Sequence, residues 1–394
     1  MKTLSWAVHG TEIVADYEVA APPGPTVTPA TTPASPATAR GSGGHLPVRG
    51  LRPVMASNML VDGEWRTDVR ETTDDDGSFQ RTTTSFRDTV RDDPDARFRP
   101  ETGRYHLYVA RACPWAHGAA LVRRLTGLED VITMDVVEPV RENDGWEFSP
   151  EKEGCTADSI LGADYLREVY VAADADYTGR VTVPVLWDRE TETVVNNESI
   201  EIMRTLSTAF QELGNGVDLY PEGLREEIDE VVDAVYDPIN NGVYRAGFAD
   251  SQRAHEAAVE ELFDALDRWN DHLADRRYLV GDRLTLADLR LFATLVRFDE
   301  VYHTIPTTLS EDYRGVDPNP EKWKRIQDYE HLHAYLRDLY QTPGFAETTN
   351  LSHISEHYAS PGSPQLHTHD PEDVDLGLAE PHDRDRLAPA PVDK

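Results

Sequence analysis

Cys113 is the residue whose type and position most clearly suggest chemistry. It follows an apolar, strand-like run at 105–110 and precedes Pro114, which opens an amphipathic stretch ending near Leu125. Proline suits the first turn of a helix because the amide hydrogen that it lacks would have no partner there, so Cys113 is predicted at the helix N-cap. Free amides and the helix dipole stabilise a thiolate at that position and lower its pKa from about 8.5 to roughly 3.5–7.5. A buried, inert cysteine is the alternative.

Pro184 interrupts an otherwise strand-like run, VTVPVLW at 181–187. Proline is normally excluded from the interior of a sheet because it has no amide hydrogen to donate. A cis Val183–Pro184 bond, rare among X–Pro bonds in general, would explain its presence. The backbone of Val183 would then be exposed to pair with the peptide of a thiol cofactor. A proline on an edge strand is the alternative.

Glu198 and Ser199 open a second predicted helix, in NNESIEI at 196–202. Ser199 is expected at the N-cap, with its hydroxyl and the nearby amides directed outward, which suits a ligand carboxylate. Glu198 could bind a ligand ammonium. A plain helix cap explains the same residues.

Two further residues are candidates for cofactor binding. Trp146 lies in a polar loop, ENDGW at 142–146, where it could cover the cofactor or simply pack the loop. Arg167 could pair with a cofactor carboxylate, as could Arg180, although surface salt bridges would account for both.

The elements that must position these residues follow two patterns. Strand-like runs alternate with helical stretches up to about residue 213, which favours an α/β domain; they lie at 106–110, 131–137, 181–187 and 193–197. After Tyr220 the apolar residues follow helical spacing, at 222–237, 251–274 and 286–302. We therefore expect a tail or wrongly assigned start at 1–54, an α/β domain with an insertion at 55–215, an all-helical domain at 220–350 and a partly disordered extension at 351–394.

The composition narrows the function classes. The 394 residues include 72 acidic and 38 basic side chains, a net charge of −34, with only five lysines. Such a surface repels nucleic acid and anionic membranes and resembles the proteins of salt-loving archaea. The two cysteines, Cys113 and Cys155, are too few for a secreted disulfide scaffold, and no signal sequence or membrane span is evident. A reducing cytoplasm is the expected compartment.

The motif CPWAH at 113–117, after its strand, resembles the active-site motif of the Xi-class glutathione transferases, the glutathionyl-hydroquinone reductases. The resemblance covers roughly residues 59–360 in the family's order; it includes GRVTVPVLWD (179–188), NNESIEI (196–202), YDPINNGVYRAGFA (236–249), YLVGDRLTLADLRLFATLVRFDEVY (278–302) and DYEHLHAYLRDLYQTPG (328–344). It implies a thioredoxin-like N-terminal domain, an all-α C-terminal domain and a homodimer.

The resemblance also implies roles for single residues. Glu198 and Ser199 would hold the γ-glutamyl end of glutathione, and Asp288 would serve folding through a capping box with Thr285. Tyrosines of the helical domain would hydrogen-bond a quinol oxygen or give it a proton; Tyr244 and Tyr335 are the first choices, with Tyr236 and Tyr329 behind them.

The predicted function is reductive removal of glutathione from an S-conjugated hydroquinone through a mixed disulfide on Cys113. Salt-loving archaea are expected to use γ-glutamylcysteine in place of glutathione, and no metal is expected. A glutaredoxin-like protein deglutathionylase and a non-catalytic interaction module are the alternatives. Gly118 departs from the arginine usual in the family, which would remove a cation near the thiol. Cys155 is either a resolving thiol or incidental.

Overall fold

The computed structural model describes residues 6–8, 11–13, 56–70, 78, 83–249, 251–304, 323–360 and 374–387. The chain divides into two units, residues 1–52 and 53–394. In the first, strands β1 (Trp6–Val8) and β2 (Thr11–Ile13) pair antiparallel. The remainder of the predicted tail lies outside the described residues.

The second unit is built on a four-stranded sheet with the order β6-β5-β8-β9. Its strands are β5 (Tyr105–Val109), β6 (Thr133–Val136), β8 (Val185–Asp188) and β9 (Thr193–Asn196). Strand β5 runs parallel to β6 and antiparallel to β8, and β8 runs antiparallel to β9. Strands β5 and β8 and most of β9 are buried, as their continuous apolar runs predict.

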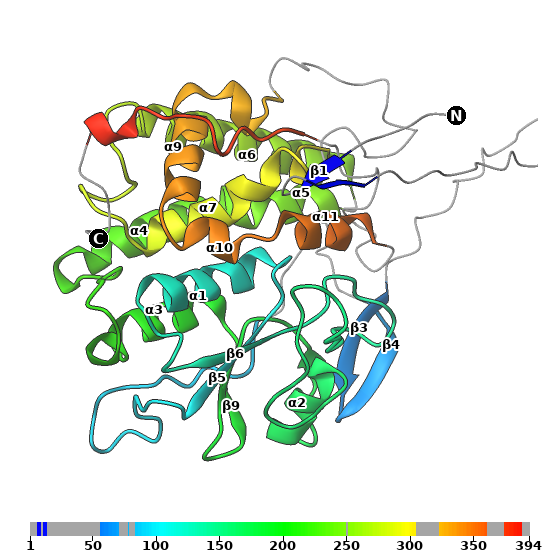
Figure 1. The fold of residues 1–394 in the computed structure, drawn as a ribbon. Helices are drawn as coiled ribbons and strands as arrows, with labels where there is room; N and C mark the ends of the chain where they lie inside the picture. The colour runs from blue at the N-terminus through cyan, green and yellow to red at the C-terminus, as the bar shows by residue number, and fades with distance from the viewer. Residues whose placement is uncertain are drawn as a thin grey trace, which may run out of the picture. The chain divides into compact units, whose positions relative to one another are not determined.

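Helices cover the sheet. Helices α1 (Pro114–Leu125) and α3 (Ser199–Thr208) pack together between the sheet and the helical domain, and α2 (Leu166–Ala173) lies against β9 (Figure 1). This parallel-then-antiparallel sheet with its helices confirms the predicted α/β class. It places the starts of α1 and α3 beside the helical domain.

A second sheet, β4-β3-β7, supports the long connection between β6 and α2. Strands β3 (Ala56–Val61), β4 (Glu64–Arg70) and β7 (Gly179–Arg180) form it. Asn58 Nδ2 and Trp65 Nε1 both donate to the carbonyl of Asn143, at 3.0 and 2.9 Å. The hairpin thereby holds the loop that leads to Trp146.

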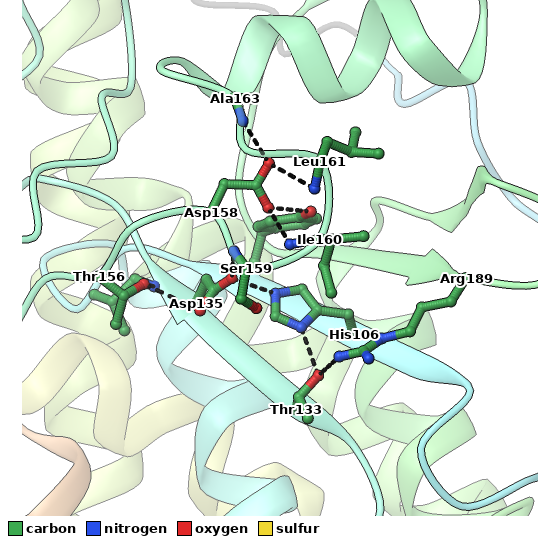
Figure 2. A network of polar contacts seen from close by, with 12 residues as sticks. His106, Thr133, Asp135, Thr156, Asp158, Ser159, Ile160, Leu161, Ala163 and Arg189 are labelled. Carbon is green, nitrogen blue, oxygen red and sulfur yellow. Dashed lines mark hydrogen bonds and ion pairs between the residues drawn. The ribbon is translucent and has the colours of Figure 1, made fainter.

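A buried polar network anchors the later part of the same connection (Figure 2). His106 on β5 lies 2.6 Å from the hydroxyl of Thr133 and 3.1 Å from a carboxylate oxygen of Asp135. Burial disfavours the ionised form of Asp135, but hydrogen bonds from His106 and Ser159 keep its pKa below the ordinary value. Asp158 accepts the hydroxyl of Tyr108 and three backbone amides of its own loop. These bonds fix the loop at 156–163 on the sheet.

The second domain is all-helical, as predicted. Its helical segments are α4 (Arg225–Val235), the π-helical turn η3 (Tyr236–Asn240), α5 (Gly242–Phe248), α6 (Gln252–His272), α7 (Leu286–Phe298), η4 (Tyr302–Thr304), α9 (Glu330–Gln341), α10 (Phe345–Thr348) and α11 (Leu351–Ala359). Helix α7 is buried along its whole length and contacts α1. No helix in the described part of the chain is long and apolar enough to cross a membrane.

Two described parts of the segment after residue 350 pack against the helical domain. Helix α11 packs Ile354 and Tyr358 into the core. Further on, Arg384 is 1% exposed and donates to the carbonyls of Leu273, Arg276 and Arg277. Residues 374–387 are therefore docked on the helical domain.

Asp288 generates a prediction about stability. It is fully buried and accepts hydrogen bonds from the amides of Leu279 and Thr285 and from the hydroxyl of Tyr335. Burial raises its pKa to about 6, and these bonds oppose that rise. Replacing Asp288 by Ala strands several buried donors, so we expect a loss of about 2–4 kcal/mol in the free energy of unfolding.

Denaturant unfolding in molar salt measures this loss. The control is Tyr335→Phe, which removes a single donor and should cost about 1 kcal/mol. Equal stability of the Asp288→Ala variant and the unmodified chain would contradict a folding role for the capping box.

Candidate active site

Cys113 occupies the N-cap of α1, as predicted. Its backbone is extended, with φ −77° and ψ 121°, and Pro114 begins the helix. The side chain is half-buried, and Sγ lies 3.7 Å from the carbonyl oxygen of Val183. The thiol therefore belongs to the N-cap residue of α1, a position at which the helix dipole and free amides favour negative charge on sulfur.

The Val183–Pro184 bond is cis, which confirms the sequence prediction. Strand β8 begins at Val185, so the proline stands before the ladder with β5 and removes none of its hydrogen bonds. Val183 is 4% exposed. Its peptide group is thus fixed next to the sulfur of Cys113.

Glu198 and Ser199 mark the start of α3. The helix begins at Ser199, so Glu198 takes the N-cap position that we predicted for Ser199. The hydroxyl of Ser199 accepts a hydrogen bond from Arg290 Nη1 at 2.9 Å, and Thr84 donates to the carboxylate of Glu198 at 3.4 Å. The half-buried carboxylate and the helix start are suited to an ammonium and a carboxylate of one ligand.

Two arginines of α7 join the helical domain to these sites. The guanidinium of Arg290 lies 4.5 Å from the ring of Trp115 and 5.5 Å from that of Tyr236. Arg297, seven residues further along α7, is fully buried and donates to the carbonyls of Arg111 and Ala112 at 3.0 Å each. We did not single out either residue from the sequence. Two arginines inside the apolar stretch at 286–298 nevertheless indicate buried guanidinium groups that need hydrogen-bond acceptors.

Three tyrosine hydroxyls meet in the helical domain. Tyr244, Tyr302 and Tyr358 form a triangle with oxygen–oxygen distances of 2.7–3.1 Å. The ring of Tyr244 lies 5.8 Å from that of Trp115, two residues after Cys113. Burial raises the pKa of Tyr302 and of Tyr358 well above the ordinary value, so both phenols stay protonated and can donate. The choice of Tyr244 is consistent with this cluster; its two partners were missed.

Tyr335 is not part of this cluster. It is fully buried on α9, and its hydroxyl donates to Asp288 at 2.8 Å. That bond commits the phenol to the capping box, so the structure supports a folding role for Tyr335 rather than the catalytic role that we expected. Of the second choices, Tyr236 lies by Trp115, whereas Tyr329 stands at the start of α9.

Trp146 is 5% exposed and stacks on His357 of α11, with the ring centroids 5.5 Å apart and an interplanar angle of 14°. His357 Nδ1 lies 2.7 Å from the carbonyl oxygen of Pro139, and its ring contacts that of Tyr358. The tryptophan loop and the tyrosine triangle are therefore linked through one histidine. The predicted placement of Trp146 beside the cofactor remains open to test.

Arg167 is occupied by the tryptophan loop. Its Nη1 donates to the carbonyl of Asp144 and lies 3.3 Å from that residue's carboxylate, and its guanidinium stacks 4.0 Å from the ring of Tyr165. These contacts favour a role in holding the loop. They do not support the cofactor contact that we predicted.

The structure also bears on Gly118 and Cys155. A Cβ atom at Gly118 would lie 2.6 Å from the sulfur of Met203 on α3, so this position faces the contact between α1 and α3, and a larger side chain would require the Met203 side chain to move. Burial raises the pKa of Cys155 to about 11. A thiol with that pKa is a poor nucleophile at neutral pH, which argues against a resolving role. Among the described residues, no group of three His, Cys, Asp or Glu could hold a metal ion.

A cysteine at a helix start beside a cis-proline, on a thioredoxin-like sheet backed by an all-helical domain, defines the cysteine-type glutathione transferases. Residues 112–209 match the family model of the glutathione S-transferase N-terminal domain, and residues 252–338 match that of the C-terminal domain. With the relatives described next, the chain belongs to the Xi class of this family, the glutathionyl-hydroquinone reductases.

Two curated relatives carry that name. The glutathionyl-hydroquinone reductase YqjG of Escherichia coli is 44% identical over 306 residues, covering 76% of this chain and 89% of the relative. PcpF of Sphingobium chlorophenolicum is 45% identical over 302 residues, covering 76% and 90%.

Solved structures agree with this family. The Xi-class transferase from the haloarchaeon Natrialba magadii is 53% identical and superposes with a TM-score of 0.74 over 85% of this chain and 98% of that one. The glutathione-bound structure of YqjG is 41% identical, with a TM-score of 0.69 over 83% and 99%. The family and fold that the sequence predicted are confirmed.

His357 yields a prediction about pH. Burial first, and the charge of Arg141 second, lower its pKa from about 6.5 to about 3. Between these two values the unfolded chain takes up a proton that the folded chain does not, so stability falls as the pH falls from 6.5 towards 3. The slope should reach about 1.4 kcal/mol per pH unit for this one residue.

Chemical denaturation at pH 7.0, 6.0 and 5.0 tests this dependence. Asn at 357 keeps an N–H for the carbonyl of Pro139 but does not titrate. His357→Asn should therefore lose less stability between pH 7 and pH 5 than the unmodified chain, whatever its stability at pH 7. Parallel curves for the two proteins would show that the folded chain accepts the proton as readily as the unfolded one.

Proposed function

We propose that this chain removes glutathione or γ-glutamylcysteine reductively from S-conjugated hydroquinones. One observation carries the proposal: Cys113 stands at the start of α1, 3.7 Å from the Val183 carbonyl, and Trp115 connects it to the hydroxyl triangle. A nucleophilic sulfur and neutral phenols are the two functions that the reaction needs. The names of the two curated relatives support the same activity.

The chain offers a separate group for each part of a γ-glutamyl thiol. The peptide of Val183, fixed by the cis bond, would pair with the peptide of the bound thiol. Glu198 would hold its ammonium, and the start of α3 with Ser199 would hold its α-carboxylate. These contacts would place the conjugate's sulfur against Cys113.

The first chemical step is attack by the Cys113 thiolate on the sulfur of the conjugate. A sulfur–sulfur bond forms, and the bond between the conjugate's sulfur and the aromatic carbon breaks, its electron pair passing to the ring. The ring carbon takes up a proton, and hydroquinone leaves. The products are free hydroquinone and a mixed disulfide of Cys113 with the γ-glutamyl thiol.

The second step regenerates the enzyme. A second γ-glutamyl thiol, as its thiolate, attacks the mixed disulfide at the sulfur that does not belong to Cys113. The symmetric disulfide leaves, and the Cys113 thiolate returns to the start of α1. The ring is reduced overall, and two γ-glutamyl thiols are oxidised.

The tyrosine triangle would bind and protonate the quinol. Because Tyr302 and Tyr358 are neutral, with raised pKa values, a hydroxyl of the triangle that turns from its neighbour could donate its hydrogen bond to a quinol oxygen as negative charge grows on the ring. The hydroxyl of Tyr244 is hydrogen-bonded to those of Tyr302 and Tyr358, and its ring contacts Trp115. Tyr244 would therefore link the quinol-binding hydroxyls to the segment that carries Cys113.

The choice between the two thiols, the homodimer and the cytoplasmic location stay predictions. The 53% identity with the Natrialba magadii protein and the charge of −34 favour γ-glutamylcysteine. Initial rates with each thiol, at molar potassium chloride, would decide this choice.

The reactivity of Cys113 is the first test. We expect iodoacetamide to alkylate Cys113 in molar salt with an apparent pKa at least one unit below about 8.5, measured by peptide mass spectrometry across pH 5–10. Cys155 in the same digest is the internal control, because its pKa of about 11 keeps it unreactive over most of this range.

Turnover of an S-glutathionyl hydroquinone should vanish in Cys113→Ala and persist in Cys155→Ala. A Cys113 as unreactive as Cys155 would leave a non-catalytic module. A reactive Cys113 that reduces protein mixed disulfides but not quinol conjugates would instead indicate a glutaredoxin-like deglutathionylase.

The tyrosines give a second test. Phe in place of Tyr244 or Tyr358 removes one member of the hydroxyl triangle, and we expect kcat to fall about 10- to 100-fold with little change in the alkylation of Cys113. Tyr335→Phe is the matched control, since its hydroxyl serves Asp288, and its kcat should stay within about twofold. A larger loss in the Tyr335 variant than in the other two would restore the original choice of Tyr335.

A further inference from the structure

Arg297 is the most completely buried arginine near the thiol, with 0% of its surface exposed. Every nitrogen of its guanidinium has an acceptor. Nε donates to the carbonyl of Ala112 at 3.0 Å, Nη2 to that of Arg111 at 3.0 Å, and Nη1 to that of Ala293 at 2.6 Å. All three of these acceptors are neutral backbone carbonyls. Burying a guanidinium charge against neutral groups costs desolvation free energy, which suggests that the charge itself has a role.

The two loop carbonyls belong to the peptides that lead directly into Cys113. Because both carbonyls accept hydrogen bonds from one planar guanidinium, the orientation of residues 111–112 is fixed. This orientation supports the extended backbone of Cys113 at the N-cap of α1. Cys113 thereby stays at the start of α1, beside the unpaired amides of the first turn. Arg297 comes from α7 of the helical domain, so the loop is held from the opposite side of the domain boundary.

His117 on the first turn of α1 completes the arrangement. Its Nδ1 lies 3.1 Å from Arg297 Nη1, and its Nε2 lies 3.2 Å from the hydroxyl of Thr348. Burial, followed by the charge of Arg297, lowers the pKa of His117 well below the ordinary value. The ring is therefore neutral, accepts from Arg297 through Nδ1 and donates to Thr348 through Nε2. It therefore cannot supply positive charge to the thiolate.

The charge of Arg297 has no carboxylate partner among the described residues. Its field reaches His117 on α1, Tyr302 on η4, and His357 and Tyr358 on α11, while Arg111 adds a second cation on the loop itself. All of these neighbours are neutral or cationic at neutral pH. Among the described residues, the group next to these contacts that this charge can stabilise as an anion is the thiol of Cys113, one residue beyond the Ala112 carbonyl that Arg297 binds.

We infer that Arg297 is a positioning residue for the nucleophile: it orients the 111–112 loop and the first turn of α1, and it provides the buried positive charge that favours the Cys113 thiolate. The inference deepens the proposed function and rests on it for the effect on turnover. Its effect on the thiol does not depend on which substrate the enzyme uses.

Two variants separate the hydrogen bonds to the 111–112 loop from the positive charge. Arg297→Met removes both, and Arg297→Lys keeps the charge but loses the planar guanidinium that bonds both carbonyls. Arg384→Met is the matched control: Arg384 is 1% exposed and also donates to backbone carbonyls of the helical domain, but it holds the segment at 374–387 instead of the Cys113 loop. Each protein is measured as the full chain in molar salt, first for its free energy of unfolding and then for the two readouts below.

The first readout is the pH profile of Cys113 alkylation by iodoacetamide. Arg297→Met should raise the apparent pKa by about one unit or more, because it removes the positive charge bound to the two carbonyls that precede Cys113, and Arg297→Lys by less than half of that shift. Arg384→Met should leave the profile unchanged even if it lowers stability equally. If Arg297→Met does not fold, the comparison of Arg297→Lys with Arg384→Met still decides, because the second readout distinguishes them.

The second readout is the steady-state rate with an S-glutathionyl hydroquinone. Arg297→Lys should lower kcat about tenfold with little change in KM, since a misplaced nucleophile reacts slowly but binding groups on Val183 and α3 are intact. An alkylation profile and kcat in both Arg297 variants equal to those of Arg384→Met would overturn the inference. Absence of turnover in the unmodified chain would instead refute the proposed function and leave the alkylation test standing.

Discussion

The peptide groups just before Cys113 impose the constraint on which the site depends. They are removed from water at a boundary between two domains, where neither the sheet nor α1 can satisfy their carbonyls. A donor must therefore come from outside the thioredoxin-like domain, and α7 supplies it through Arg297. The same guanidinium also contacts His117 on α1. The packing of the helical domain therefore determines the conformation around the thiol.

Buried arginines satisfy hydrogen-bond acceptors at several other places in the chain. The acidic surface keeps lysine scarce, with five in the whole sequence, yet arginines are buried at several junctions; these include Arg277 against Asp338, Arg290 against Ser199, and Arg384 against three carbonyls. A planar fork with five donors satisfies several acceptors at once and is less strongly hydrated than an ammonium. The preference for arginine over lysine thus serves the interior as well as the surface.

Sequence alone was sufficient wherever a role depends on neighbours along the chain. Cys113 before Pro114 and the cis Val183–Pro184 bond each follow from a few consecutive residues, and the N-cap of α3 was predicted to within one residue, at Ser199 instead of Glu198. The tyrosines show where such reasoning ends. Tyr335 and Tyr358 both lie on buried helix faces, and only the packing shows that one hydroxyl meets Asp288 while the other meets Tyr244.

The same limit explains Gly118 and Arg167. One turn after the thiol, position 118 looked like the place for a cation, but helix geometry turns it towards Met203. Arg167 looked like a ligand for a carboxylate because its partner, Asp144, lies in a loop whose path no local pattern predicts. Long-range contacts, not residue types, decided both cases.

Helix α11 has a consequence for how the enzyme is made. It contributes Tyr358 to the hydroxyl triangle and His357 to the stack on Trp146, and it lies far downstream of the strand that carries the thiol. A ribosome exposes the thioredoxin-like half first, so that half can form its sheet before the phenols exist. The hydroxyl triangle is therefore completed late in synthesis, and a chain released before α11 would carry Cys113, Tyr244 and Tyr302 without Tyr358.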